Sequence, residues 1–268
     1  PHTGNSIRIG ITGVPGVGKS TFIESFGQTV IGDGKKVAVL AVDPSSPVAG
    51  GSILGDKTRM EQLSRETNAF IRPSPAGKAL GGVALKTRES MLLCEAAGFD
   101  VVVVETVGVG QSEHQVGSMV DFFLILLLPG GGDELQGIKK GILELADAIL
   151  INKADGESEN LANNTRLHYQ SALSLLTQSG FWSPEVRTCS ALERSGIAEA
   201  WDMVRRFHDE ALAAGHLANM RSEQNLQWMW QLTDQLLRQQ ITDHPTLTTR
   251  LSAIEAEVGA AKLTPLSA

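Results

Sequence analysis

Residues Gly13–Ser20 have the sequence GVPGVGKS, and this stretch decides the fold because it fits the phosphate-binding pattern GxxxxGK[ST] without a mismatch. Before it, Ile7–Ile11 alternates with period two, which predicts a strand. After it, Ser20–Val30 has apolar residues at helical spacing. A strand, a glycine-rich turn and a helix in this order are the context that the pattern requires, so we expect a phosphate-binding loop here.

This loop would supply several groups to a bound polyphosphate. Its glycines let successive backbone N–H groups turn inward around the β-phosphate, which residues with a Cβ permit less readily. Lys19 should reach the β- and γ-phosphate oxygens, and the Ser20 hydroxyl should bind Mg²⁺. The predicted nucleotide-binding residues of this segment are Gly13, Pro15, Gly16, Val17, Gly18, Lys19, Ser20 and Thr21.

Short β-rich runs recur along the chain beyond this loop. They are Val37–Val42, Val101–Val104, Phe122–Leu128, a run ending in Ile149–Ile151, and Glu185–Thr188. Between them we expect helices at Thr58–Arg65 and Lys86–Gly98. We expect loops at Gly50–Gly55 and Pro73–Gly82. Strands that alternate with helices indicate right-handed βαβ crossovers. The sequence therefore predicts an α/β fold of the P-loop NTPase class, with a mostly parallel sheet flanked by helices.

The β-rich runs stop near Gly196. We expect residues 1–196 to form the P-loop domain and residues 197–268 to form a C-terminal helical extension. Helices are predicted at Ile197–Leu217 and Gln224–Ile241, and farther on one narrow apolar stripe contains Leu247, Leu251, Ile254 and Val258. The stripe could pack back on the domain, or it could be buried against a second subunit as part of a dimerisation arm. Two helices with no sheet to cover favour the arm.

Composition limits the kinds of partner. The chain has 268 residues, with 23 Lys and Arg against 30 Asp and Glu, and the formal charge of −7 argues against nucleic acid or an anionic membrane as a partner. Its longest apolar run, Phe122–Leu128, is too short to cross a bilayer, so we expect no membrane insertion. Cys94 and Cys189 are far apart, as in a cytoplasmic protein with reduced thiols. Because the first residue is Pro1, we expect an N-terminal segment to be missing.

The base of the nucleotide is predicted by Asn152-Lys153-Ala154-Asp155, which follows the fifth expected strand. Both carboxylate oxygens of Asp155 can accept from guanine, at N1–H and the 2-amino group, whereas adenine offers neither donor. Asn152 and Lys153 are suited to bracing the loop and covering the base. Farther on, a backbone amide of Ser190-Ala191-Leu192 could bind guanine O6. We therefore expect guanine rather than adenine, and the predicted base-binding residues are Asn152, Lys153, Asp155, Ser190, Ala191 and Leu192.

Three acids lie near the expected phosphate end. Asp43 and Glu105 end two buried strands, and Asp56 follows a glycine-rich loop. Acids at such positions beside a P-loop usually hold Mg²⁺ directly or through water, although each could also be a solvated acid at the end of a strand. The predicted metal-binding residues are Ser20, Asp43, Asp56 and Glu105.

The hydrolytic residues follow a less common pattern. Gly108 fits the switch glycine whose N–H senses the γ-phosphate, but the next residue is Val109, and Gln111 comes later than in common GTPases. We therefore expect slow intrinsic turnover. The polar, glycine-rich segment Gly130–Lys140 suits a moving element, or else a plain surface loop.

The motifs GVPGVGKST, VDPSSP, GDKTRM, ETVGVGQSE, DELQGIKKG and NKAD occur in this order and resemble those of the MeaB/ArgK GTPases. The match runs from about Ile7 to Ser195. These proteins are G-protein chaperones of the adenosylcobalamin enzyme methylmalonyl-CoA mutase, and they were long named as kinases of a lysine/arginine/ornithine transport system. The resemblance implies a homodimeric GTPase with Mg²⁺ and a mutase partner. It also implies mobile switches around Asp56, Gly108 and Gln136–Lys140.

We therefore predict a GTP-binding and GTP-hydrolysing chaperone that assembles, loads or protects methylmalonyl-CoA mutase. The expected catalytic residues are Lys19, Glu105, Gly108, Gln111 and Lys139. One alternative is an ATP-dependent kinase or ATPase linked to lysine/arginine/ornithine transport, although the HRD and DFG motifs of protein kinases are absent. A second alternative is a metallochaperone GTPase, which would need a Cys/His cluster that two distant cysteines do not supply.

Overall fold

The computed structural model describes residues 6–43, 60–75, 82–106, 112–130, 140–176 and 181–267. The chain divides into two compact units, Pro1–Arg221 and Ser222–Ala268. The first unit contains strands β1 (Ile7–Gly13), β2 (Val37–Asp43), β3 (Ala69–Pro75), β4 (Val101–Glu105), β5 (Phe122–Leu127), β6 (Ala148–Ile151) and β7 (Glu185–Thr188). Its helices are α1 (Lys19–Gly32), η1 (Leu63–Arg65), α3 (Gly82–Ala96), α4 (Ser112–Gly117), α5 (Lys140–Leu143), η3 (Gly156–Ser158), α6 (Glu159–Leu176), α7 (Ile197–Ala213) and the start of α8 (His216–Asp243).

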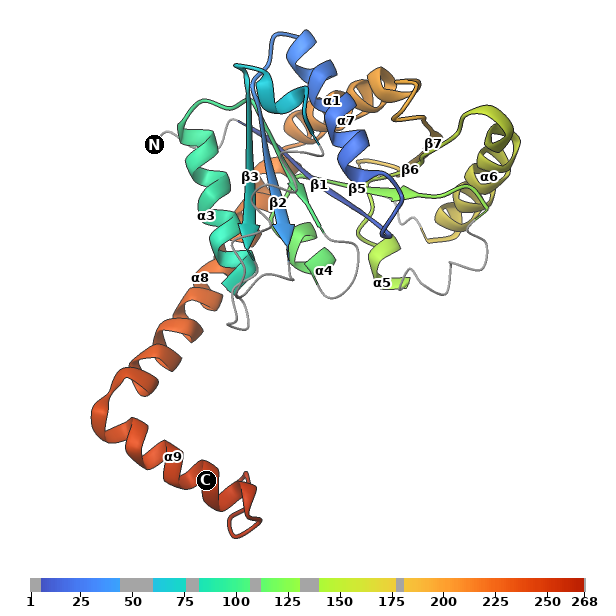
Figure 1. Cartoon of the computed structure of the whole chain (residues 1–268). Coiled ribbons are helices and arrows are strands. Elements are labelled where there is room, and N and C mark those ends of the chain that lie inside the picture. The colour runs from blue at the N-terminus through green and yellow to red at the C-terminus, as the bar shows by residue number, and fades with distance from the viewer. Residues whose placement is uncertain are drawn as a thin grey trace. The chain divides into compact units, whose positions relative to one another are not determined.

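The seven strands form one sheet in the order β3-β2-β4-β1-β5-β6-β7 (Figure 1). Every neighbouring pair is parallel. All strands therefore end at the same side of the sheet, which we call the carboxyl edge, and begin at the opposite side, the amino edge. The topology confirms the predicted α/β fold, and it places the loop after β1 between two neighbouring strands at the edge where such sheets bind ligands.

Alternate side chains of the central strands enter two separate cores. In β4, Val101 and Val103 face the core beneath α1 and α7, whereas Val102 and Val104 face the core beneath α3, α4 and α6. Strands that are buried on both faces need continuous apolar runs, which explains why β4 and β5 contain almost nothing else. The helical layers visible in Figure 1 thus cover both faces of the sheet.

Three segments differ from the expectations. Ala69–Pro75 is a strand that the sequence analysis did not identify, and its last residues overlap the expected loop Pro73–Gly82. The expected helix Thr58–Arg65 is present, within the described residues, as the short helix η1. Helix α6 was not singled out in advance.

Helix α7 covers the sheet, although no sheet was expected for it to cover. Trp201, Val204 and Phe207 of this helix are buried in the same core as α1. The Phe207 ring lies 5.0 Å from that of Phe122 in β5, and the two planes are nearly perpendicular. Because α7 packs in this way, the first compact unit extends to Arg221, beyond the predicted domain boundary at residue 196.

The second unit consists of the rest of α8 followed by α9 (Pro245–Gly259). Pro245 occupies the first turn of α9, where a missing N–H costs nothing, and the preceding His244 Nδ1 accepts from the Leu247 N–H. The unit has large exposed apolar side chains, including Leu226, Trp230 and Leu237. Such a surface is unusual for a helix that has no partner.

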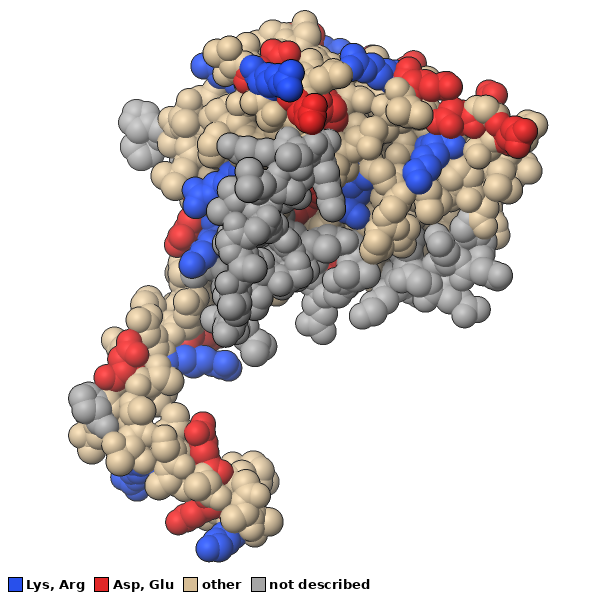
Figure 2. All heavy atoms as spheres, in the orientation of Figure 1, with Lys and Arg blue, Asp and Glu red and all other residues tan. Residues whose placement is uncertain are grey.

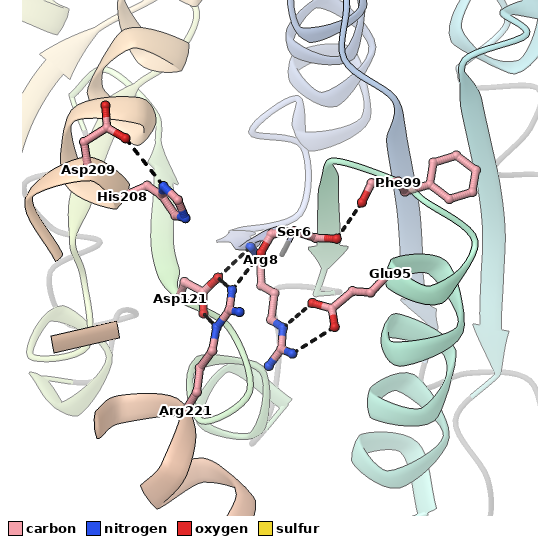
Figure 3. A network of polar contacts seen from close by, with 8 residues as sticks. All are labelled: Ser6, Arg8, Glu95, Phe99, Asp121, His208, Asp209 and Arg221. Carbon is pink, nitrogen blue, oxygen red and sulfur yellow. Dashed lines mark hydrogen bonds and ion pairs between the residues drawn. The ribbon is translucent and has the colours of Figure 1, made fainter. Parts of the chain in front are cut away.

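At the amino edge, charged side chains form a buried network, which is shown in Figure 3. Arg8 of β1 donates to both carboxylate oxygens of Glu95 in α3, at 2.7 and 3.0 Å. Arg221 of α8 donates to both oxygens of Asp121, at 2.8 and 2.6 Å, and also to the Ser6 carbonyl. The Arg8 N–H adds a further hydrogen bond to Asp121. This amino-edge network therefore joins the first strand, the loop before β5, α3 and the beginning of α8.

The surface carries charges of both signs. On the face seen in Figure 2, basic and acidic side chains alternate over the described residues and do not separate into large areas of one sign. Among the described helices, none has the length and apolar character needed to cross a membrane.

Candidate functional site

The predicted phosphate-binding loop connects β1 to α1 at the carboxyl edge. β1 ends at Gly13 and α1 begins at Lys19. Gly16 and Gly18 have φ of 82° and 94°, in the left-handed region that residues with a Cβ rarely adopt. A Cβ on Gly18 would also lie 2.8 Å from Nδ2 of Asn152. The backbone thus has the turned conformation that allows N–H groups to surround a phosphate.

Lys19 is buried beneath this loop, with 9% of its surface exposed. Its Nζ donates to the carbonyl oxygens of Gly13 (2.7 Å) and Val14 (3.3 Å). Burial lowers the pKa of Lys19, while the carboxylates of Glu105 and Glu113 act in the opposite direction. The ammonium group is therefore held at the loop, where it can exchange carbonyl oxygens for phosphate oxygens when a nucleotide binds.

Two of the predicted metal-binding residues lie next to this loop. Glu105 ends β4, is 9% exposed and is in register with Ile11 of β1. The following residue, Thr106, donates its N–H to the Ile11 carbonyl (3.0 Å) and its hydroxyl to that of Thr12 (2.7 Å). Ser20 is half-buried in the first turn of α1. The end of β4 is thus fastened to the strand that leads into the phosphate loop, and both oxygen donors lie at one edge.

Asn152 joins the phosphate loop to the loop that follows β7. Its side chain is buried, and its Nδ2 donates to the Val17 carbonyl at 2.8 Å, while its Oδ1 accepts from the Ala191 N–H at 3.0 Å. The Ala191 carbonyl in turn accepts from the Ser25 hydroxyl of α1 at 2.7 Å. Because both ends of the Asn152 amide are used within the protein, this residue braces the two loops.

The other predicted base-binding residues lie around this brace. Asp155 is half-buried, and one of its carboxylate oxygens accepts from the Ser190 hydroxyl. Lys153 is exposed and has φ of 61°, and the Leu192 side chain is 79% exposed. The structure therefore brings the two base-binding segments together beside the phosphate loop, with a carboxylate oriented by a hydroxyl and two long side chains at the surface.

Several predicted residues cannot be placed in this site. Asp56, Gly108, Gln111 and Lys139 lie outside the described residues. Asp43 is the last residue of β2, and only its backbone is among the described parts of the chain. Pro15 and Thr21 are exposed on the phosphate loop and on the first turn of α1, respectively.

Glu113 is a buried acid that the sequence analysis did not single out. It lies in the first turn of α4, is 3% exposed and acts on Lys19 electrostatically. Its signal was present in the motif ETVGVGQSE, where it is the next acid after Glu105. Sequence alone gave no reason to separate it from a solvated helix acid.

The described cysteines and histidines show no metal-binding arrangement. Cys94 and Cys189 are both free and buried, as predicted, and burial raises their thiol pKa values to about 11 and about 12. Across the described ranges, no three His, Cys, Asp or Glu side chains gather in a way that could hold a metal ion. The described residues thus offer nothing to support a metallochaperone with a Cys/His site.

Comparisons with known proteins agree with this geometry. The family model described as methylmalonyl-CoA mutase-associated GTPase MeaB matches residues 1–246. A GTPase named ArgK from Escherichia coli strain K12 is 55% identical over 236 residues, which cover 88% of this chain and 71% of that protein. The mitochondrial methylmalonic aciduria type A homolog of Mus musculus is 48% identical over 261 residues, which cover 97% of this chain and 63% of that protein.

A solved structure gives the same result for the fold. The crystal structure titled LAO/AO transport system kinase has a TM-score of 0.76 and 42% sequence identity, and the match covers 99% of this chain and 80% of that one. The match therefore extends over the sheet, the predicted phosphate loop and the predicted base-binding segments.

Proposed function

The chain belongs to the family of methylmalonyl-CoA mutase-associated GTPases, MeaB, and from this premise we propose that it is a GTP-dependent chaperone of an adenosylcobalamin-dependent methylmalonyl-CoA mutase. In this proposal the GTP-bound and GDP-bound states make different contacts with the mutase, and hydrolysis releases one set of contacts. The relatives named after methylmalonic aciduria support the link to this enzyme.

The chain is a GTPase, which binds GTP and converts it to GDP and phosphate. The observation that carries the choice of guanine is the brace at Asn152, which places Asp155 beside the phosphate loop. A carboxylate there pairs with the N1–H and 2-amino donors of guanine and finds no such donors on adenine. The ATP-dependent kinase alternative is not favoured, because it would need a different base site.

The residues at the carboxyl edge fit Mg²⁺. The Ser20 hydroxyl and the Glu105 carboxylate are hard oxygen donors, and the structure brings them to the same edge as Lys19. When bound, Mg²⁺ would neutralise charge on the phosphates. We propose that Ser20, Glu105, Asp43 and Asp56 hold the ion. Lys19 would contact the β- and γ-phosphates, while Gly108, Gln111 and Lys139 would act in the switches.

The test uses the purified chain and purified methylmalonyl-CoA mutase. GTP hydrolysis is measured with and without the mutase, and we expect the mutase to accelerate it. The matched variant is Asp155→Asn, whose amide can donate to the 2-oxygen of xanthine. In this variant the mutase should accelerate hydrolysis of xanthosine triphosphate and no longer that of GTP. A rate that the mutase leaves unchanged for the native chain with GTP would contradict the proposal.

We propose further that the second unit mediates homodimerisation. Leu226, Trp230, Leu237 and Ile241 are all exposed and follow one another at i, i+4, i+11 and i+15, so they share one face of α8. A second copy of the chain offers the same apolar face, and isologous contacts of this kind are the commonest form of dimer.

The dimer is tested by sedimentation equilibrium of the whole chain. Trp230→Glu introduces a charge on this face and should give a monomer. Gln231→Glu introduces the same charge at an exposed polar position next to it and should leave the dimer intact. If the native chain sediments as a monomer at micromolar concentration, this part of the proposal is wrong.

A further inference from the structure

Glu113 has an unmet requirement for a hydrogen-bond donor. Only 3% of its surface is exposed, and its Oε2 is buried without a hydrogen-bond partner among the described residues. A buried carboxylate oxygen that makes no hydrogen bond is destabilising, so native structures rarely keep one unless a water, an ion or a ligand completes it. The position of Glu113 indicates what that group is.

Glu113 lies at the carboxyl edge, beside the phosphate loop. Helix α4 packs against β1, since a Cβ on Gly10 would lie 3.0 Å from a methyl group of Val116. In a parallel α/β sheet the helix runs opposite to the strands, so the first turn of α4, which contains Glu113, is at the carboxyl edge. Its electrostatic effect on Lys19 agrees with this placement.

The charges at this edge do not balance when a nucleotide is present. Glu105 and Glu113 are two buried carboxylates near one buried ammonium, that of Lys19. A nucleoside triphosphate adds several more negative charges at the same place. Carboxylates close to phosphates repel them unless a cation lies between the two, and a divalent cation is the usual solution.

Lys19 does not form a direct ion pair with Glu113. Its Nζ donates to the carbonyl oxygens of Gly13 and Val14 instead. When a nucleotide binds, this ammonium is expected to turn toward the phosphates, farther into the loop. The described residues thus offer no donor to Oε2, and a group that arrives with the nucleotide can supply one.

We propose that Glu113 is a positioning residue for Mg²⁺, whose carboxylate accepts a hydrogen bond from a water molecule bound to the metal in the nucleotide complex. This inference rests on the Mg²⁺ site of the proposed function. Glu113 would act through the water, and Ser20 and Glu105 would lie closer to the ion. The carboxylate would favour nucleotide with Mg²⁺ and disfavour nucleotide without it, because its charge repels bare phosphates.

The experiment measures the affinity of the whole chain for fluorescent mant-GDP, once with excess EDTA and once with millimolar Mg²⁺. In Glu113→Gln, we expect the gain in affinity from Mg²⁺ to fall roughly 10- to 100-fold, the usual effect of removing an outer-sphere group. Affinity in EDTA should stay the same or increase, because the repulsion is gone. The control Glu144→Gln changes an exposed acid after α5 and should behave like the native chain.

Two further measurements keep the test decisive. Electron paramagnetic resonance of Mn²⁺ in the GDP complex should show weaker metal binding in Glu113→Gln, independently of hydrolysis. Glu113→Asp retains the charge on a shorter side chain and should recover part of the response to Mg²⁺, which also covers the case that the first variant folds poorly.

The outcomes separate the inference from the proposal on which it rests. If Glu113→Gln weakens mant-GDP binding equally in EDTA and Mg²⁺, or changes neither, Glu113 does not position the metal and the inference is wrong. If the native chain itself shows no response to Mg²⁺, the proposed metal site fails, and the inference fails with it.

Discussion

The two edges of the sheet differ in how their buried charged side chains are paired. At the amino edge, Arg8 pairs with Glu95 and Arg221 pairs with Asp121, each through two hydrogen bonds. At the carboxyl edge, among the described residues, Lys19 donates to the backbone carbonyls of Gly13 and Val14, and Oε2 of Glu113 has no hydrogen-bond partner. Buried charged groups that are paired within the chain hold its elements together, whereas charged groups without such a partner are available to a ligand.

The comparison predicts the largest loss of stability at the amino edge. Asp121→Ala leaves Arg221 buried without its carboxylate and removes the acceptor of the Arg8 N–H. Breaking a buried pair in this way costs about 3–5 kcal/mol in the free energy of unfolding. Urea denaturation of the whole chain measures it.

The control for this variant is an ion pair on the surface. Asp202→Ala breaks the contact with Arg205 on the exposed side of α7 and should leave the urea midpoint unchanged. If both variants shift the urea midpoint equally, burial does not explain the contribution of the amino-edge network to stability.

At the carboxyl edge the same kind of change should affect function instead. Lys19→Met removes the ammonium and keeps a side chain of similar length in the buried position. We expect the rate constant for GTP hydrolysis to fall roughly 10²- to 10³-fold, equivalent to about 3–4 kcal/mol in the barrier, as for other groups that stabilise developing charge. The free energy of unfolding should stay constant or rise, because burial of the Lys19 ammonium outweighs its attraction to the carboxylates of Glu105 and Glu113. Single-turnover hydrolysis and urea denaturation, measured on the same preparation, test both parts.

One acid at the amino edge is an exception to the comparison. Asp147 precedes β6 and accepts the Phe123 N–H at 2.8 Å. Burial, together with the nearby negative charge of Asp121, raises the pKa of Asp147 to about 7 despite this hydrogen bond. The folded state thus binds a proton that the unfolded state has released above about pH 4. The stabilisation by this group is complete below pH 4 and is lost as the pH rises from 4 to 7.

The variant Asp147→Asn should remove this pH dependence and keep an acceptor for the Phe123 N–H. The full linkage of about three pKa units corresponds to roughly 4 kcal/mol. Because the surface of Asp147 is only half-buried, we expect a smaller gain of about 2 kcal/mol at pH 8. Urea denaturation at pH 4, 6 and 8 compares the variant with the native chain. Parallel curves for the two proteins across this range would show that Asp147 titrates normally.

Contiguous motifs explain how much could be predicted from the sequence. The phosphate loop and Asn152–Asp155 each lie within a few residues, so their spacing alone predicted the fold class and the nucleotide. Strand β3 was missed because it contains Pro73 and Pro75, which normally argue against a strand. Because β3 is the first strand of the sheet and pairs only with β2, prolines are tolerated there.

Contacts between distant residues explain what could not be predicted. Asp121 and Arg221 are 100 positions apart, and no local pattern pairs them. A helix was predicted at Ile197–Leu217 with no sheet to cover, but α7 (Ile197–Ala213) is buried against the sheet, because which surface covers a helix depends on contacts between distant residues. Glu113 belongs to the same class, since its burial and its missing partner exist only in the folded chain.

The smallest predicted effect concerns a polar contact that should contribute both to stability and to nucleotide binding. Ser25 of α1 donates to the Ala191 carbonyl, and this contact within the chain supports the loop that is proposed to bind the base. Ser25→Ala should therefore lower the free energy of unfolding by about 1 kcal/mol, because one hydrogen bond is lost. It should also weaken GDP binding a few-fold. Thr29→Ala is the control, because its hydroxyl bonds only the Ser25 carbonyl within α1. Calorimetric titration with GDP should show no change for Thr29→Ala, and an equal change in both variants would mean that α1, rather than the contact with Ala191, determines the affinity.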